Sequence, residues 1–112
     1  HKYARFEGRY SHRSIGGDPL NEGVTTIKYL RKNILETRGK DTDGRWQGRI
    51  MMSDGVPGYG TGVYQYEGKS DCGRHEIQVS LDGQTIFVYV LNTSHGKNYT
   101  FAYTWNRFHE KA

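Results

Sequence analysis

The sequence predicts an all-β fold: a compact, roughly eight-stranded antiparallel up-and-down β-barrel. Short segments of alternating apolar and polar residues recur along the whole chain, separated by polar turns. The 112 residues include 15 glycines, nine tyrosines and only two prolines, a composition that favours strands and tight turns over helices. Eight strands can close into a barrel, which removes exposed sheet edges. A chain of this length is expected to form one domain, 1–112.

The clearest elements lie in the C-terminal third. Strands at 75–81 and 84–91 flank Asp82-Gly83, a pair typical of a two-residue type I′ hairpin turn, in which both residues take a positive φ. A loop at 92–98 follows. The last strand, 99–107, places four aromatic side chains on one face because alternate residues of a strand point the same way: Tyr99, Phe101, Tyr103 and Trp105. These three strands predict an antiparallel meander.

The first part of the chain is less regular. Residues 3–13 alternate as a half-buried strand, and 14–23 form a Gly- and Pro-containing loop. The stretch 24–35 fits a helical stripe, and it also fits strands at 24–30 and 34–38 joined by a turn. Its β-branched residues favour the strands. The remaining elements are a turn at 39–44, a strand at 45–52, a break at 53–58, a strand at 59–67 and a loop at 68–73.

The distribution of charged residues and the identity of the first residue suggest which partners and which location the protein has. Residues 1–50 carry eleven Lys and Arg against six Asp and Glu, whereas 51–112 carry five against six. A basic half suggests an anionic partner or acidic lipid headgroups, and a solvated basic surface is the alternative. Cys72 is the only cysteine, which favours a reducing compartment. Because the chain begins at His1 rather than Met, we expect a processed chain or an excised piece of a longer protein.

No catalytic set stands out. The five histidines lack zinc-site spacing, and Cys72 has no cysteine partner. His75 and Glu76 are neighbours on a strand and point to opposite faces. The glycine-rich segment 58–62 lacks the strand-to-helix context of a phosphate loop. We therefore expect no enzyme activity, no metal and no cofactor.

Binding is better supported than catalysis. Small closed barrels hold one ligand in the mouth or lumen. Aromatic faces stack nucleobases and arginine pairs with phosphate, a combination that suits a nucleotide more than a fatty acid. The alternative is that these aromatics are core and these arginines are solvated. The candidate ligand-binding residues are Trp46, Arg49, Tyr64, Arg74, Tyr103, Trp105 and Arg107.

Five glycine- and aromatic-containing segments carry a resemblance to known barrels: 6–10, 44–48, 60–66, 73–77 and 103–107. Their order looks like a compact barrel of the lipocalin or streptavidin type. More narrowly, it resembles the barrel domain of the membrane effectors of bacterial cyclic-oligonucleotide antiphage signalling (CBASS). In that family two transmembrane helices precede a strand-rich domain that senses a cyclic dinucleotide.

The resemblance implies a cytoplasmic cyclic-dinucleotide receptor domain, held at the bacterial inner membrane by a segment absent from this chain. Ligand binding would drive homo-oligomerisation and membrane disruption, with no DNA or RNA partner. Two alternatives stay open. A lipocalin-like carrier of a small apolar ligand predicts an apolar lumen and salt-independent binding, whereas charged nucleotide contacts are screened by salt. A structural or interaction barrel predicts a filled lumen and no ligand.

Overall fold

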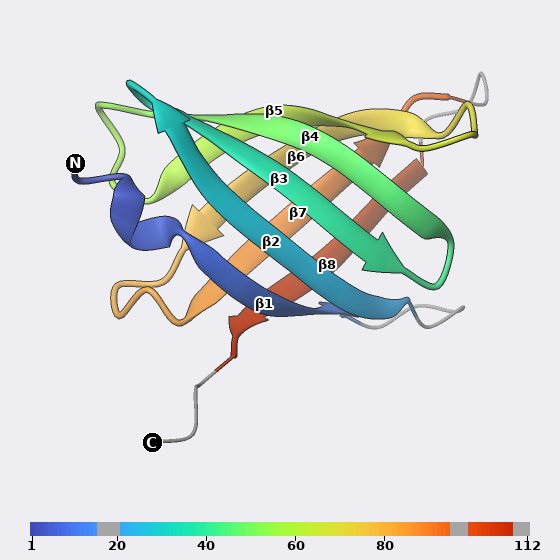
Figure 1. The fold of residues 1–112 in the computed structure, drawn as a ribbon, viewed down its shortest axis with the longest axis horizontal. Helices are drawn as coiled ribbons and strands as arrows, with labels where there is room; N and C mark the ends of the chain where they lie inside the picture. Colours follow the sequence, from blue (N-terminus) through green and yellow to red (C-terminus); the bar gives the residue numbers. More distant parts are fainter. Residues whose placement is uncertain (16–20, 95–98, 109–112) are drawn as a thin grey trace.

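Eight antiparallel strands, each paired with the next along the chain, close into a barrel because the first also pairs with the last (Figure 1). The computed structural model describes residues 1–15, 21–94 and 99–108, so the predicted loops at 14–23 and 92–98 lie partly outside the described residues. The predicted fold class is confirmed. The strands are β1 (Gly8–Ser14), β2 (Glu22–Arg31), β3 (Ile34–Asp41), β4 (Gly44–Met52), β5 (Tyr59–Tyr66), β6 (Cys72–Val79), β7 (Thr85–Asn92) and β8 (Tyr99–Arg107).

The ambiguous stretch at 24–35 is strand, as its β-branched residues indicated. β2 and β3 pair antiparallel, and Arg31 opposite Ile34 is the last pair before the turn. A register shift between Tyr29 and Arg31 marks an irregularity just before that turn. Thr25 and Ile27 point inward and are fully buried, which shows the two-residue period of a strand.

The prediction of a strand over 3–13 is wrong at its start. Ala4–Phe6 form a short 3-10 helix, η1, and β1 begins only at Gly8. Tyr3 and Phe6 are buried against the barrel core, because their side chains cover one end of the lumen. In Figure 1 this helix lies at one end of the barrel. We call it the plugged end.

The hairpin between β6 and β7 exists, but its predicted type I′ turn is wrong. The connection spans residues 80–84, and among these only Gly83 takes a positive φ, 73°. The Asp82 carboxylate accepts a hydrogen bond from the Gln84 amide at 3.0 Å. An aspartate side chain that accepts a hydrogen bond from the backbone N–H two residues further on stabilises a turn of this kind. A type I′ turn would instead need two residues with positive φ. Leu81, predicted to be in the strand, is fully exposed in the turn.

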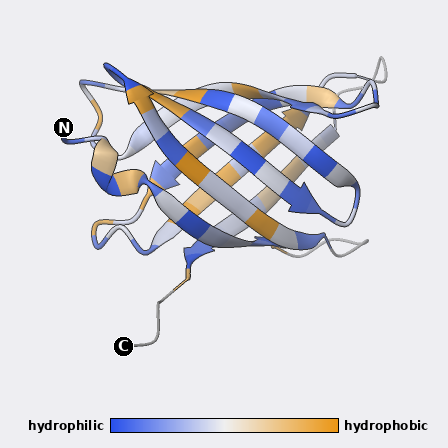
Figure 2. Ribbon diagram, in the orientation of Figure 1, coloured by the Kyte–Doolittle hydropathy of each residue, from blue (hydrophilic) through white to orange (hydrophobic). Residues whose placement is uncertain are grey.

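Inward-facing side chains form a core that changes character along the barrel. Figure 2 shows hydrophilic and hydrophobic residues alternating along the strands, which places one set inside and the other outside. Near the plugged end the buried residues are aliphatic or aromatic. Further along, the lumen holds buried polar side chains: His12, Thr25, Thr37 and His75. The polar part of the lumen is therefore displaced from the plugged end.

One glycine of β3 makes room for a tryptophan. Gly39 pairs with Trp46 of β4, and a Cβ built at Gly39 would lie 2.2 Å from Cε2 of that indole. We expect Gly39→Ala to push Trp46 out of place, to lower the free energy of unfolding by about 1–3 kcal/mol and to shift the tryptophan fluorescence. Guanidinium unfolding followed by emission measures both. Gly55→Ala is the control because a Cβ there meets nothing within 4 Å; equal behaviour of the two variants would contradict the prediction.

Candidate ligand-binding site

Away from the plugged end, the lumen opens into a cavity of about 560 Å³, a volume within the range of small-molecule sites. We call this cavity the cup. Trp46, His12 and His75 are its most buried polar or aromatic lining residues, together with Tyr64. Several other described residues also line the cup: Asn21, Asp41, Asp43, Tyr66, Asp71, Asn92, Tyr99, Phe101 and Tyr103.

An array of rings forms the inner part of the cup. The rings of Tyr64 and His75 stack, with centroids 4.6 Å apart. His75 meets Trp46 and Trp105 edge-on, at 5.3 and 5.5 Å. The two indoles stack on each other at 5.9 Å. These rings come from four strands, and the inward parity of each strand brings them together. A planar ligand would therefore meet flat aromatic surfaces in the cup.

His12 has a defined tautomer. The Trp105 indole donates Nε1–H to His12 Nδ1 at 2.8 Å, and an indole nitrogen can only donate. Nδ1 therefore carries no proton, and neutral His12 holds its proton on Nε2. That Nε2 lies 3.8 Å from a carboxylate oxygen of Asp41, beyond hydrogen-bond distance. Among the described residues, His12 Nε2–H thus has no hydrogen-bond partner in the cup wall.

Two further buried polar atoms on cup-lining side chains lack a hydrogen-bond partner among the described residues: Asn21 Oδ1 and His75 Nδ1. Asn21 and His75 are 7% and 5% exposed, and His12 is 5% exposed. Buried polar groups are ordinarily hydrogen-bonded, and an unsatisfied one costs roughly 1–3 kcal/mol. These atoms are therefore the groups that a bound ligand would satisfy.

Burial disfavours the charged forms of five side chains of the cup: His12, His75, Tyr64, Tyr66 and Tyr103. It lowers the pKa of His12, against the smaller opposing effects of Asp41 and of the Asn21 side chain, and lowers the pKa of His75 to about 3. Burial also raises the pKa of Tyr64 and of Tyr103 to about 12 each. The pKa of Tyr66 rises through burial and through its hydrogen bond to Asp41.

The charge of the cup is negative. Asp41, Asp43 and Asp71 line it, and no Lys or Arg does so among the described residues. Asp41 accepts hydrogen bonds from the Tyr66 hydroxyl and the Asp43 amide, and Asp43 accepts one from Asn21 Nδ2 at 3.0 Å. Carboxylates accept but do not donate, so this part of the cup favours N–H donors.

The structure separates the seven residues predicted from the sequence. Trp46, Tyr64 and Tyr103 line the cup. Trp105 is fully buried and stacks on Trp46, but it does not itself line the cup. The aromatic members of the set thus lie together, whereas the three arginines do not join them.

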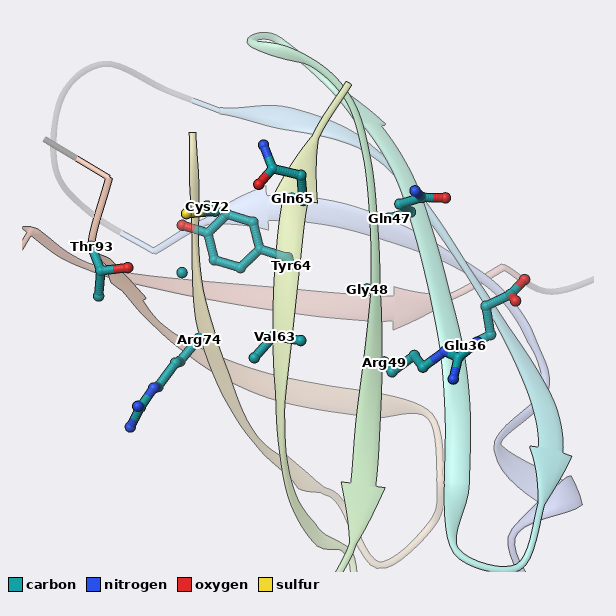
Figure 3. Close-up of a pocket in the computed structure, with 11 residues that line it drawn as sticks. Glu36, Gln47, Gly48, Arg49, Val63, Tyr64, Gln65, Cys72, Arg74 and Thr93 are labelled. Carbon is teal, nitrogen blue, oxygen red and sulfur yellow. The ribbon is translucent and has the colours of Figure 1, made fainter. Parts of the chain in front are cut away.

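Arg49 and Arg74 lie on the outer surface. Arg49 of β4 and Arg74 of β6 each lie opposite Val63 of β5 in the sheet. The Val63 side chain is 59% exposed, and Figure 3 shows it between the two arginines. They border a groove, here called the outer groove, together with Glu36, Gln47, Gln65 and Cys72. Arg107 lies at the plugged end, where its guanidinium donates to the carbonyl oxygens of Glu7 and Arg5.

Sequence reasoning missed the polar residues of the cup. His12 shares the inward parity of Tyr10 on β1, and a polar residue on an otherwise apolar face was the available signal. Asp41 and Asp43 lie at the β3–β4 turn, where turn chemistry alone explains an aspartate. Asn21 carries no such signal because its role depends on contacts with distant residues.

The chain matches no protein-family model and no curated protein. Among solved structures it is similar to one described as "De novo design of a fluorescence-activating beta barrel", with a TM-score of 0.67 and 18% sequence identity, over 94% of this chain and 96% of that chain. This likeness concerns the fold alone. The fold and the cup together define a small closed β-barrel with a ligand-sized cavity.

Two searches of the described residues add facts about metals and membranes. No group of three or more His, Cys, Asp or Glu is arranged to hold a metal ion there, and His95 and His109 lie outside the described residues. In the same part of the chain, no helix has the length and apolar character needed to span a bilayer.

Proposed function

We propose that this barrel is a receptor domain that binds a nucleobase-bearing small molecule in the cup, and that the ligand is a cyclic dinucleotide, as the resemblance to CBASS effectors implies. The observation that carries the proposal is the set of buried, unpartnered polar atoms beside aromatic rings. A nucleobase has flat faces that stack on aromatic rings and edges that hydrogen-bond. The cup supplies partners for both.

The two alternatives are less well supported. A carrier of an apolar ligand would need an open apolar lumen, but the aliphatic part of this lumen is filled by core side chains such as Leu35, Ile50 and Ile86. A barrel with only a structural role would not need buried polar atoms without partners around a cavity of about 560 Å³.

The phosphates of such a ligand would lie outside the mouth of the cup, because carboxylates line the cavity and repel them. Lys69 is a cation at this mouth: its ammonium donates to the Asp43 carbonyl oxygen and lies 5.9 Å from the Tyr66 ring. We assign Lys69 the role of phosphate contact in this proposal. Arg49 and Arg74, in the outer groove, define a competing location for the phosphates.

The proposed output follows the resemblance: ligand binding drives homo-oligomerisation, brings membrane segments outside this chain together and disrupts the bacterial inner membrane. Sedimentation of the domain with and without ligand tests the first of these steps.

The binding test is a thermal-shift screen against cyclic dinucleotides and trinucleotides, with fatty acids alongside, at low and moderate salt. A ligand that binds only the folded state raises the melting temperature. We expect a shift with a cyclic dinucleotide that shrinks as salt rises. Lys69→Gln should reduce the shift and its salt dependence, and Arg74→Gln, on the outer face, should leave both unchanged.

The opposite response of these variants would assign the ligand to a different site. Loss of binding in Arg49→Gln and Arg74→Gln, with Lys69→Gln unchanged, would place the ligand in the outer groove. A shift with a fatty acid alone would make the barrel an apolar carrier.

A further inference from the structure

We infer that the cup selects the base that enters it: a nucleobase that presents a hydrogen-bond acceptor beside an exocyclic amino group, as adenine, guanine and cytosine do. The inference rests on the proposed function and names its base specificity. It follows from which atoms of the cup can donate, which can only accept, and how their orientations are held.

One donor in the cup is held in place. Because Trp105 donates to His12 Nδ1, the His12 proton is on Nε2. The neighbouring rings restrict the His12 side chain: Tyr103 lies 4.4 Å away between centroids and Trp105 lies 6.4 Å away. A ligand must therefore supply an acceptor to this N–H. A ring nitrogen or a carbonyl oxygen of a base provides one.

Two hydrogen-bond acceptors lie near His12. Asn21 directs its Nδ2 to the Asp43 carboxylate at 3.0 Å, and this bond sets the amide orientation so that Oδ1 is the unpartnered atom. Asp41 presents a carboxylate oxygen 3.8 Å from His12 Nε2. Donor and acceptors therefore lie side by side at the cup wall, and the acceptors are in excess.

An amino group matches this excess of acceptors. Its two N–H bonds can serve an amide oxygen and a carboxylate at the same time, whereas the single ring N–H of uracil or hypoxanthine serves one of them. A base without the amino group leaves a buried acceptor unsatisfied, which sites built on hydrogen bonds penalise strongly. Uracil and hypoxanthine should therefore bind more weakly.

Isothermal titration of the whole chain tests this with four cyclic dinucleotides. Cyclic di-AMP and cyclic di-GMP carry amino-bearing bases, and cyclic di-UMP and cyclic di-IMP do not. We expect the tightest ligand to be amino-bearing, and both amino-free ligands to bind at least about tenfold more weakly than it.

Two variants test the residues. Asn21→Leu removes the acceptor Oδ1, and Asp41→Asn replaces the buried acceptor-only carboxylate beside His12 with an amide of the same shape; each should bring the amino-bearing and amino-free ligands closer in affinity. Gln47→Leu is the matched control, because Gln47 lies in the outer groove and should keep the preference. Thermal melts establish that each variant is folded before it is titrated, and the near-isosteric Asp41→Asn retains the test should Asn21→Leu fail to fold.

The outcomes separate the two proposals. Absence of binding by every cyclic dinucleotide overturns both the proposed function and the base preference. Binding of all four with equal affinity leaves the proposed function standing and overturns the base preference. A preference that survives in both folded cup variants overturns the assignment of the base edge to Asn21 and Asp41.

Discussion

Acidification from pH 7 to pH 4 is expected to destabilise the folded barrel steeply, with His75 as a principal cause. The pKa of this histidine falls from 6.5 to about 3 on folding, mainly through burial and also through the nearby His12. Between these two values the unfolded chain binds a proton that the folded protein does not. Stability is therefore complete above about pH 7 and falls with decreasing pH by up to about 1.4 kcal/mol per unit for each such histidine.

Guanidinium unfolding at pH 7, 5.5 and 4.5 measures this loss. His75→Phe keeps an aromatic ring between Tyr64 and the indoles and removes the titrating group, so its stability should depend less on pH. His1→Phe is the matched control, because His1 is exposed, and it should follow the parent protein. The same pH dependence in His75→Phe as in the parent would show that burial of His75 is not the cause. His12, whose pKa burial also lowers, accounts for part of the slope that remains.

Arg107→Met is expected to lower the free energy of unfolding by about 2–4 kcal/mol. The guanidinium holds the plugged end: it donates to Glu7 O at 2.7 Å, Arg5 O at 3.0 Å and the Tyr10 hydroxyl at 2.7 Å, and it lies over the Tyr10 ring at 4.9 Å. Hydrogen bonds to a charged group contribute about 1.5–3 kcal/mol each to stability. In a partly exposed cluster such as this one, the separate contributions do not add up in full. Methionine keeps an apolar stem and removes the donors.

The control for this variant is Arg74→Met, on the exposed outer face of β6, which should change stability by no more than about 0.5 kcal/mol. Chemical denaturation compares the two. A parent-like midpoint for Arg107→Met would contradict the structural role. Ligand titration of the folded variant adds a second result: because Arg107 lies at the plugged end, away from the cup, its removal should leave ligand affinity unchanged.

The sequence predicted most strands because their signals are local. Alternation in 45–52, 59–67 and 99–107 depends on neighbouring residues, and β4, β5 and β8 occupy these ranges within one residue. The start of β1 could not be predicted in this way. Residues 3–6 also alternate, but they form η1 because Tyr3 and Phe6 find apolar partners at the end of a barrel that closes far along the chain.

The candidate site was predicted only in part. The aromatic members Trp46, Tyr64 and Tyr103 lie together because they share the inward parity of their strands. Alternation separates a strand into two faces without saying which faces the lumen, and Arg49 and Arg74 lie on the outer one. Their separation from the aromatics became clear only once the sheet had closed.

The sequence by itself determined the fold class and the antiparallel order of the strands, because period-two alternation and turn residues act over a few positions. Only the tertiary structure decided which polar groups meet. Closure of β1 against β8 joins His12 to Trp105 across 93 positions, while Arg107, two residues beyond Trp105 with the same parity, lies about 6.6 Å further along the strand toward the plugged end. Long-range closure of the sheet therefore created the cup, and the rise along β8 places Arg107 outside it.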